Sequence, residues 1–447
     1  MIRMNGAMRV AVVGAGLAGL TVAAYLQRAN FDVAVYEQTS SFERIGAGII
    51  LGANAVAPLT RLGLLPGLIA AGIRPDAFVS RTWDSGETIY ELVLDAAAEA
   101  RFGGPLLNIH RADLHAVLQT ALRPGSIVFG HRLAGLEETP HAIRLRFDNG
   151  ATAEADIVIG ADGIWSRVRD VLLGSGPPRF TGRVAQRAIF PANRIAGPRI
   201  RDCTKWWGTD RHILAYFMTS RRDEVYLMAS VPAASWESEQ TSLPCDRDQF
   251  IVGFAHFHAD LRRAVEAAVE VTVWPICDRE RNDLWSNRRI VLLGDACHPV
   301  RPYMAAGGSM AIEDATILAR CLVAYVDPTM AFRCYQAMRV SRVAEVQRIS
   351  LENSWMRGPT ETDWFFSYDA TTVALAPPDR LKPGVLTVNQ VANKDRQPDA
   401  PHNFGCSLQR SIDTIRHRSS TERPIRSCMP LMKGGNIFRH FVAHKAQ

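Results

Sequence analysis

A glycine-rich turn between two strand-like segments constrains the fold of this chain more than any other feature. The apolar run 10–13 predicts a buried strand, and the motif Gly14-x-Gly16-x-x-Gly19 follows it and opens a helix-periodic segment. A second strand-like run, 32–36, ends at the acidic residue Glu37. This order of strand, glycine turn, helix and strand predicts an α/β fold with a Rossmann-like parallel sheet.

Each residue of this motif has a task in binding a dinucleotide. Gly14 permits the tight turn, Gly16 lets the backbone approach a pyrophosphate, and Gly19 lets the helix pack closely on the strand. The free N–H groups and positive dipole end of the helix face the phosphates. Glu37 is placed to accept hydrogen bonds from a ribose diol and disfavours a 2′-phosphate, which indicates FAD or NAD rather than NADP. Ordinary turn glycines are the alternative, but strand, helix and acid all stand in order.

Bulk composition narrows the class of protein. A chain of 447 residues with 47% hydrophobic and 21% charged residues is typical of a globular protein with more than one domain. The formal charge of +6 favours approach of an anionic substrate. The arginines are dispersed along the chain, so they do not indicate nucleic-acid binding. Eight cysteines without a C-x-x-C pair predict free thiols, no metal site and a cytoplasmic enzyme. The apolar run 10–26 is too short to predict a membrane span.

Two later segments repeat the pattern of a buried strand that ends in a glycine and an acid. The run 155–160 leads into Asp162 and Gly163, which taken alone would be a common turn. The run 289–294 leads into Asp295, which suits a ribityl hydroxyl or a helix cap. The pair Gly307-Gly308 then opens a helix whose first N–H groups are free to meet an anion or a flavin edge.

Segment 180–274 is strand-rich and aromatic without helical periodicity, which predicts a mixed β-sheet. Alternation within 211–218 places His212 and Tyr216 on one face, roughly 13 Å apart along the strand, so that they flank a small ring. From pattern alone a structural histidine is the commoner interpretation of His212, and a surface arginine that of Arg111.

Helical periodicity covers 55–71, 310–325 and 330–355, and Asp113 is a possible cap of a helix within 111–118. From residue 371 the composition shifts to Pro, Arg, Ser and Asn, which predicts a poorly ordered tail. The predicted division comprises a cofactor domain in three parts, 8–76, 106–178 and 281–326; a substrate domain in two parts, 77–105 and 179–280; C-terminal helices 327–370; and the tail 371–447.

The three landmarks in this order, the glycine motif, Asp162-Gly163 and Gly294-Asp295, resemble the single-component FAD-dependent aromatic hydroxylases. These group A flavoprotein monooxygenases include the para-hydroxybenzoate and salicylate hydroxylases, and the resemblance covers about 8–369. Within the family the chain looks most like the 6-hydroxynicotinate 3-monooxygenases. The segments that carry this likeness are Ile109-His-Arg-Ala-Asp-Leu-His115, Cys203-Thr-Lys-Trp-Trp207, Asp210-Arg-His212 and Gly294-Asp-Ala-Cys-His-Pro299.

That resemblance implies a para-hydroxybenzoate hydroxylase-like fold and a mechanism. NADH reduces FAD, O2 adds to give a flavin C4a-hydroperoxide, and one oxygen is transferred to a ring carbon of a small aromatic acid. With 6-hydroxynicotinate the attacked carbon bears the carboxylate, so CO2 leaves and 2,5-dihydroxypyridine forms. The family implies a monomer or homodimer.

The same resemblance implies site residues. Tyr216 and His212 match the substrate-site base and orienting group, and Cys203 matches a pocket cysteine. The implied cofactor contacts are Gly14, Gly16, Gly19, Glu37, Gly46, Arg111, Leu133, Asp162, Asp295 and Gly308.

Three departures from the family pattern leave alternatives open. Ile50 stands where a histidine is implied, and Tyr303 and Ala306 replace a histidine and a glutamine. A salicylate hydroxylase-like enzyme for another hydroxylated aromatic acid is one alternative, and a non-catalytic flavin-binding protein is another. A flavin disulfide reductase would need a redox cysteine pair or a second dinucleotide motif, and the sequence contains neither.

Overall fold

Five parallel strands form the sheet that carries the glycine motif. The computed structural model describes residues 7–44, 46–174 and 176–377, all within the unit Met1–Leu386, and the account below refers to these residues. In the sheet, Val12 pairs with Ile159 on one side and Val35 on the other. The strand order is β18 (Ile290–Leu292), β11 (Ile157–Gly160), β1 (Arg9–Val13), β2 (Asp32–Tyr36) and β7 (Ile127–Val128).

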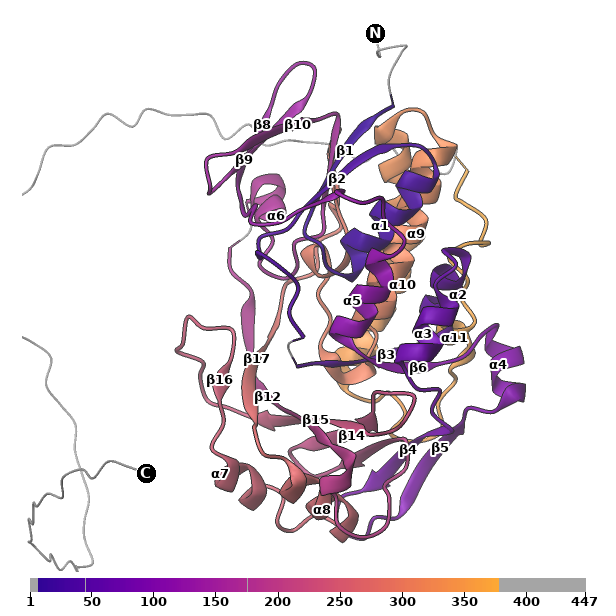
Figure 1. Cartoon of the computed structure of the whole chain (residues 1–447), viewed down its shortest axis with the longest axis vertical. Coiled ribbons are helices and arrows are strands. Elements are labelled where there is room, and N and C mark those ends of the chain that lie inside the picture. Colours follow the sequence, from indigo (N-terminus) through magenta and orange to yellow (C-terminus); the bar gives the residue numbers. More distant parts are fainter. Residues whose placement is uncertain (1–6, 45, 175, 378–447) are drawn as a thin grey trace, which may run out of the picture. The chain divides into compact units, whose positions relative to one another are not determined.

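Helices cover this sheet, which is why its strands are apolar runs rather than alternating ones. Figure 1 shows the long helices on one side of β1 and β2, with a three-stranded antiparallel sheet and α6 on the other. α1 packs directly against α9, and small residues such as Ala18 and Ala23 on α1 are fully or almost fully buried. These elements are α1 (Leu17–Arg28), α5 (Arg111–Gln119), α9 (Gly307–Ala324), α10 (Pro328–Glu352), α6 (Arg167–Leu173), β8 (Leu133–Glu138), β9 (Ile143–Phe147) and β10 (Thr152–Ala155).

A second, eight-stranded sheet lies below the first. It is mixed, because β13 runs parallel to β4 while its other pairings are antiparallel. The strand order is β16 (Leu243–Pro244), β17 (Thr272–Asp278), β12 (Arg179–Pro191), β15 (Glu224–Pro232), β14 (His212–Phe217), β13 (Cys203–Trp207), β4 (Ala77–Thr82) and β5 (Thr88–Val93).

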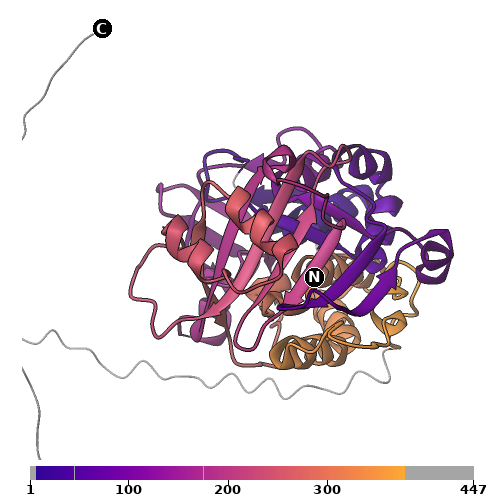
Figure 2. The same cartoon turned by 90° about the horizontal axis from the view of Figure 1, so that it is seen from below.

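The two faces of this sheet bury different sets of side chains. Ile213, Ala215 and Phe217 join a core with α7 (Arg247–Val252) and α8 (Ala259–Ala267), which cross the strands in the view from below (Figure 2). Leu214 and Tyr216 face the other way, into a separate cluster. The predicted alternation along β14 therefore separates the outer core from the side that faces the first sheet.

Short elements join the two sheets. β3 (Gly48–Leu51) and β6 (Leu107–His110) form an antiparallel pair in which Ile50 lies opposite Asn108. The remaining helices are α2 (Ala53–Arg61), α3 (Leu65–Ala71), α4 (Ala96–Phe102) and α11 (Asp363–Phe366), with 3-10 turns η1 (Ala192–Arg194), η2 (Gly294–Ala296) and η3 (Pro302–Met304). Within the described ranges, no helix combines the length and apolar character needed to cross a bilayer.

The predicted α/β class, a parallel sheet combined with a mixed sheet, is confirmed, whereas three local predictions were wrong. α7 and α8 interrupt segment 180–274, where no helix was predicted. Segment 55–71 forms two helices, separated near Gly63, which has a φ of +73°. The α5 N-terminus is capped by His110 rather than Asp113, and Asp113 instead pairs with Arg44. The domain boundaries stay a prediction, and the tail from residue 378 lies outside the described residues.

Candidate active site

The glycine turn after β1 contains two glycines that the packing of the protein requires, Gly14 and Gly19, and one that it does not, Gly16. Gly14 has a φ of +98°, and an added Cβ would lie 2.5 Å from the Ala161 carbonyl oxygen. A Cβ on Gly19 would lie 1.9 Å from the Gly14 oxygen. Gly16, in contrast, has a φ of −73° and no protein atom within 4 Å of such a Cβ. No side chain caps α1 there, so its first N–H groups face a space suited to an anion.

Four of the predicted cofactor residues lie within three residues of the carboxyl ends of parallel strands. Gly14 follows β1, Glu37 follows β2, Asp162 follows β11 and Asp295 follows β18. Because the carboxyl ends of parallel strands meet at one edge of a sheet, these residues gather where α/β proteins bind ligands. A Cβ on Gly308, at the start of α9, would contact the Leu17 side chain at 3.3 Å, so the two uncapped helix starts also converge there.

Glu37 and Asp162 both bind backbone N–H groups. The Glu37 carboxylate accepts from Ala15 N at 2.8 Å and from Thr39 N at 3.0 Å, and its remaining lone pairs are available to ribose hydroxyls. Asp162 accepts from Ser166 Oγ and from two amides at the start of α6, at 2.7 and 3.1 Å. In this structure Asp162 therefore organises α6, while Glu37 holds the glycine turn.

Asp295 and Arg111 are accessible to solvent although protein surrounds them. Burial raises the pKa of Asp295 and lowers the pKa of Arg111, and each charge attracts the other. Neither side chain makes a hydrogen bond to another described residue. Polar side chains that solvent reaches, that protein largely surrounds and that lack hydrogen-bond partners are typical of ligand sites. Asp295 and Arg111 therefore fit a flavin dinucleotide. Of the other predicted contacts, Gly46 lies beside Ile189 and Leu133 begins β8, buried.

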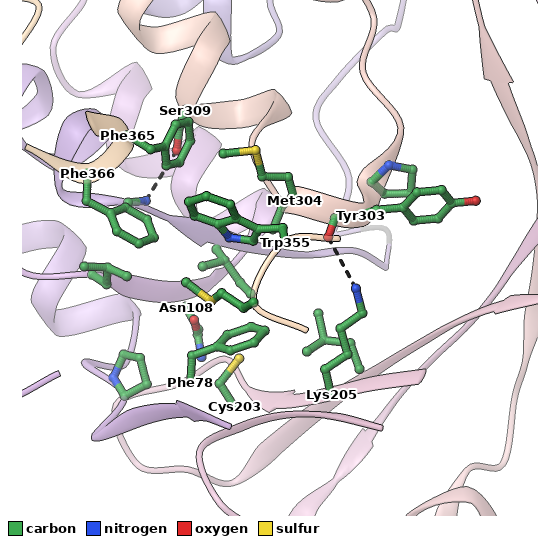
Figure 3. A pocket seen from close by; sticks show the side chains of 18 of the residues that line it. Phe78, Asn108, Cys203, Lys205, Tyr303, Met304, Ser309, Trp355, Phe365 and Phe366 are labelled. Carbon is green, nitrogen blue, oxygen red and sulfur yellow. Dashed lines mark hydrogen bonds between the residues drawn. The ribbon is translucent and has the colours of Figure 1, made fainter. Parts of the chain in front are cut away.

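A cavity partly open to solvent, with about 670 Å³ of empty space when the open solvent at its mouth is included, lies between β3 and the eight-stranded sheet. Its walls are mostly apolar and come from segments far apart in the chain (Figure 3). They include Ile50, Phe78, Leu214, Met304, Trp355 and Phe366. Polar side chains also line it, among them Asn108, Cys203, Lys205, His212 and Ser309.

Lys205 is the buried cation of this cavity. Its Nζ donates to the Tyr303 carbonyl at 3.4 Å (Figure 3) and to Asn353 Oδ1 at 3.3 Å, and lies 3.7 Å from the centre of the Trp207 ring. No acidic side chain in the described part of the chain pairs with it. Burial lowers the pKa of Lys205 well below its ordinary value, and nearby Arg357 lowers it further. An anionic ligand would supply the missing counter-charge.

His212 is neutral at pH 7 in this site. Burial lowers its pKa well below the usual range, and the charges of Lys205, Arg183 and Arg357 add to the shift. Its Nδ1 lies 3.2 Å from Asn353 Nδ2, and its buried Nε2 has no partner among the residues described. His212 thus has one ring nitrogen occupied and one available to a ligand.

Cys203 and Tyr216 pair across β13 and β14, but only Cys203 lines the cavity. The Tyr216 hydroxyl lies against Gly48, where an added Cβ would be 2.4 Å away, and its ring packs on Tyr226. Burial raises the pKa of Tyr216 well above its ordinary value and also raises that of Cys203. Both groups are therefore protonated at neutral pH.

Two cavity residues were not predicted from the sequence. Neither amide atom of the fully buried Asn108 has a hydrogen-bonding partner within the described ranges, and Lys205 lies among buried aromatic residues. Asn108 belongs to no motif, and Lys205 lies within the segment Cys203-Thr-Lys-Trp-Trp207 but was given no role of its own. The available signal was a polar residue within a buried strand, Asn108 in Leu-Asn-Ile-His of β6 and Lys205 in Cys-Thr-Lys-Trp-Trp of β13.

Comparison with known sequences places residues 7–348 in the family described as FAD binding domain. The chain is 43% identical over 369 residues to 6-hydroxynicotinate 3-monooxygenase of Bordetella bronchiseptica, covering 82% of this chain and 96% of that protein. It is 41% identical to the enzyme of the same name from Pseudomonas fluorescens, covering 84% and 98%. It is also 39% identical to 3-amino-4-hydroxybenzoate 2-monooxygenase of Streptomyces cremeus, covering 76% and 85%.

Solved structures show the same architecture. HpxO of Klebsiella pneumoniae, complexed with FAD and uric acid, superposes with a TM-score of 0.69 at 26% identity, covering 80% of this chain and 92% of that one. A salicylate hydroxylase substrate complex superposes with a TM-score of 0.70 at 24% identity, covering 82% and 96%.

Proposed function

The chain belongs to the FAD-dependent aromatic hydroxylases, as its motifs predicted, and we propose that it uses NADH and O2 to hydroxylate 6-hydroxynicotinate. It is a flavoprotein monooxygenase with FAD as its cofactor. The proposed products are 2,5-dihydroxypyridine and CO2. Reduced FAD supplies the oxygen chemistry, and the protein supplies binding, orientation and exclusion of water.

The proposed FAD contacts follow from the residues gathered at the carboxyl ends of the parallel strands and at the starts of α1 and α9. The uncapped N-terminus of α1 and Gly16 receive the pyrophosphate, and Glu37 receives the ribose hydroxyls. Asp295 suits a ribityl hydroxyl. Arg111 and the start of α9 at Gly308 suit the polar edge of the ring system.

One observation carries the substrate assignment: Lys205 and His212 both line a mostly apolar cavity. The apolar walls hold a flat ring, and Lys205 without an acidic partner attracts a carboxylate. Asn108 lies on a different side of the cavity from Lys205 (Figure 3). Its free donor and acceptor match the neighbouring N–H and carbonyl of a hydroxypyridine in its lactam form. An aromatic acid with a polar substituent opposite the carboxylate satisfies both ends.

We propose His212, Tyr216 and Cys203 as the substrate-site residues of the sheet, with His212 and Cys203 in the cavity lining and Tyr216 outside it, against Gly48. Because Tyr216 is a neutral phenol, its proposed task is to donate a hydrogen bond that orients the ring oxygen. Cys203 contributes a small, protonated wall residue.

Purified holoenzyme tests this function directly. With 6-hydroxynicotinate and ¹⁸O2, NADH consumption should rise at least tenfold over the substrate-free rate. Mass spectrometry should detect a product that has gained one labelled oxygen and lost CO2. NADH consumption that stays at the basal rate, or a product that retains the carboxylate, would exclude this substrate.

A second candidate substrate is another hydroxylated aromatic acid, and Ile50 favours it. This apolar side chain lies opposite Asn108, where the family resemblance implies a histidine. A panel containing salicylate and 3-amino-4-hydroxybenzoate distinguishes the two candidates by which acid is converted. If no acid stimulates NADH consumption by the yellow holoenzyme, the non-catalytic alternative is supported instead.

A further inference from the structure

We propose that Lys205 and Asn353 fix the tautomer of His212, so that His212 presents Nε2–H to the substrate as a hydrogen-bond donor. His212 then binds an anionic oxygen of the aromatic acid and does not act as a base. This inference rests on the proposed function, because it assigns a role to His212 in the same cavity. Lys205 and Asn353 are positioning residues that act through the imidazole.

Three separate elements bring these side chains together. Lys205 lies on β13 and His212 on the neighbouring strand β14. The antiparallel register of these strands places both side chains on the face of the sheet that borders the cavity. Asn353 ends α10 with a φ of +51°, a left-handed conformation that Asn adopts more readily than most residues. The Asn353 amide bridges the other two, with Oδ1 3.3 Å from Lys205 Nζ and Nδ2 3.2 Å from His212 Nδ1.

The lysine sets the direction of this chain of hydrogen bonds. In its charged form Lys205 only donates hydrogen bonds, as it does to the Tyr303 carbonyl, so the atom of Asn353 that faces it is the carbonyl oxygen. The amide NH2 group then points to His212 and donates to Nδ1. Rotating the amide would set two donors against each other at Lys205. Since Nδ1 accepts, the single proton of the neutral imidazole resides on Nε2.

The free end of the imidazole is where a ligand is expected. Nε2 is buried and has no partner in the described part of the chain, and His212 lines the cavity. Three cations around the ring, Lys205, Arg183 and Arg357, oppose a second proton. Trp207 and Tyr303 pack against the ring at centroid distances of 5.5 and 5.1 Å and hold its plane. A buried N–H without an acceptor is unfavourable, and a carboxylate or phenolate oxygen would satisfy it.

The decisive measurement is the ¹⁵N spectrum of the ligand-free holoenzyme labelled at histidine, at pH 7. The His212 signals are identified by their loss in His212→Gln. Nδ1 should show the shift of an unprotonated nitrogen and Nε2 that of a protonated one. A proton on Nδ1, or on both nitrogens, would overturn the proposal.

Two substitutions at residue 353 reverse or remove the relay, meaning the two hydrogen bonds that link Lys205 to His212 through Asn353. Asn353→Asp keeps the left-handed position but only accepts hydrogen bonds, so the His212 proton should move to Nδ1. Asn353→Gly removes the amide at a position that glycine tolerates, so the preference for Nε2–H should weaken. Asn30→Asp is the matched control, because Asn30 is exposed and also left-handed, with a φ of +63°. It should leave the His212 signals unchanged. An unchanged His212 tautomer in Asn353→Asp would contradict the role of Asn353.

Substrate binding gives a second readout. In Asn353→Asp the Kd of the aromatic acid, measured by flavin fluorescence, should rise at least tenfold while FAD content stays constant. The two proposals fail separately. A Nε2–H tautomer in an enzyme that converts none of the acids refutes the proposed function alone, whereas turnover by an enzyme with Nδ1–H refutes the relay alone.

Discussion

Ile50 and Asn108 lie directly opposite each other on β3 and β6, and both line the cavity. The polar member of the pair is the one without partners, since both amide atoms of Asn108 are buried and unpaired in the described structure. The apolar member, Ile50, offers it no hydrogen bond. This pairing leaves the donor and acceptor of Asn108 without a protein partner, and we propose that they bind the substrate.

Replacing Asn108 by Leu should weaken substrate binding and increase the stability of the fold. Removing an unsatisfied buried amide should raise the unfolding free energy by about 1–3 kcal/mol, measured by urea denaturation. Loss of its hydrogen bonds should raise KM for the aromatic acid about tenfold, equivalent to about 1.4 kcal/mol. Met228→Leu, another change in the cavity lining, is the control and should alter neither quantity strongly. An unchanged KM in Asn108→Leu would show that the amide does not contact substrate.

Gly16→Ala and Gly14→Ala should separate cofactor binding from folding. Nothing in the protein opposes a Cβ at Gly16, so the apoprotein should lose less than about 1 kcal/mol while FAD affinity falls at least tenfold. Gly14→Ala should lower stability by several kcal/mol, because of its positive φ and the contact with Ala161. Apoprotein melting and fluorescence titration with FAD measure the two effects. Normal FAD affinity in Gly16→Ala would contradict the proposed pyrophosphate position.

Asp314 should make the fold sensitive to acid. Burial raises its pKa, but His298 and the fully buried Arg339 outweigh that effect and lower it to about 2, from 3.8 in the unfolded chain. A lowered folded-state pKa stabilises the protein above pH 4, and the contribution, about 2 kcal/mol, is lost as pH falls from 4 to 2. Urea unfolding at pH 5 and pH 2.5 should show this loss. Asp148→Asn, at an exposed turn, should leave the pH dependence unchanged, whereas Asp314→Asn should reduce it.

Tyr216→Phe should slow oxygen transfer more than flavin reduction. The hydroxyl is protonated at neutral pH and lies beside Gly48 of the glycine-rich connection. Its removal should lower the hydroxylation rate at least tenfold and change reduction by less than twofold, in stopped-flow absorbance. Tyr226→Phe, whose ring packs against Tyr216 at 5.2 Å, is the matched control. Equal losses in both steps would refute a role for Tyr216 in orienting the ring.

The sequence predicted the features that depend on neighbouring residues. The turn at Gly14 and the alternation along β14 are local, because backbone conformation and strand periodicity act over a few residues. His110 replaced Asp113 as the cap of α5 for a similarly local reason, since its Nδ1 reaches Ala112 N at 3.1 Å. α8 escaped prediction because it is only nine residues long and two of the four residues on its buried face, Leu261, Ala264, Val265 and Ala267, are alanines.

The substrate cavity depends on contacts between distant segments, which the sequence did not predict. Lys205 and Asn353 are 148 residues apart and meet only because the C-terminus of α10 lies beside β13. Asn108 becomes notable only once β6 pairs with β3 and leaves its amide unsatisfied. Neither relationship has a periodic or motif signature, since both arise from tertiary packing.

The cavity walls extend along the chain from Ile50 to Phe366. During synthesis on the ribosome, the glycine turn and its first strands emerge long before Trp355 and Phe366 do. A nascent chain therefore acquires the elements that hold the nucleotide before it can enclose the substrate chamber. A message truncated ahead of codon 355 would encode a polypeptide whose cavity lacks part of its wall. The apolar residues left exposed would be binding sites for chaperones.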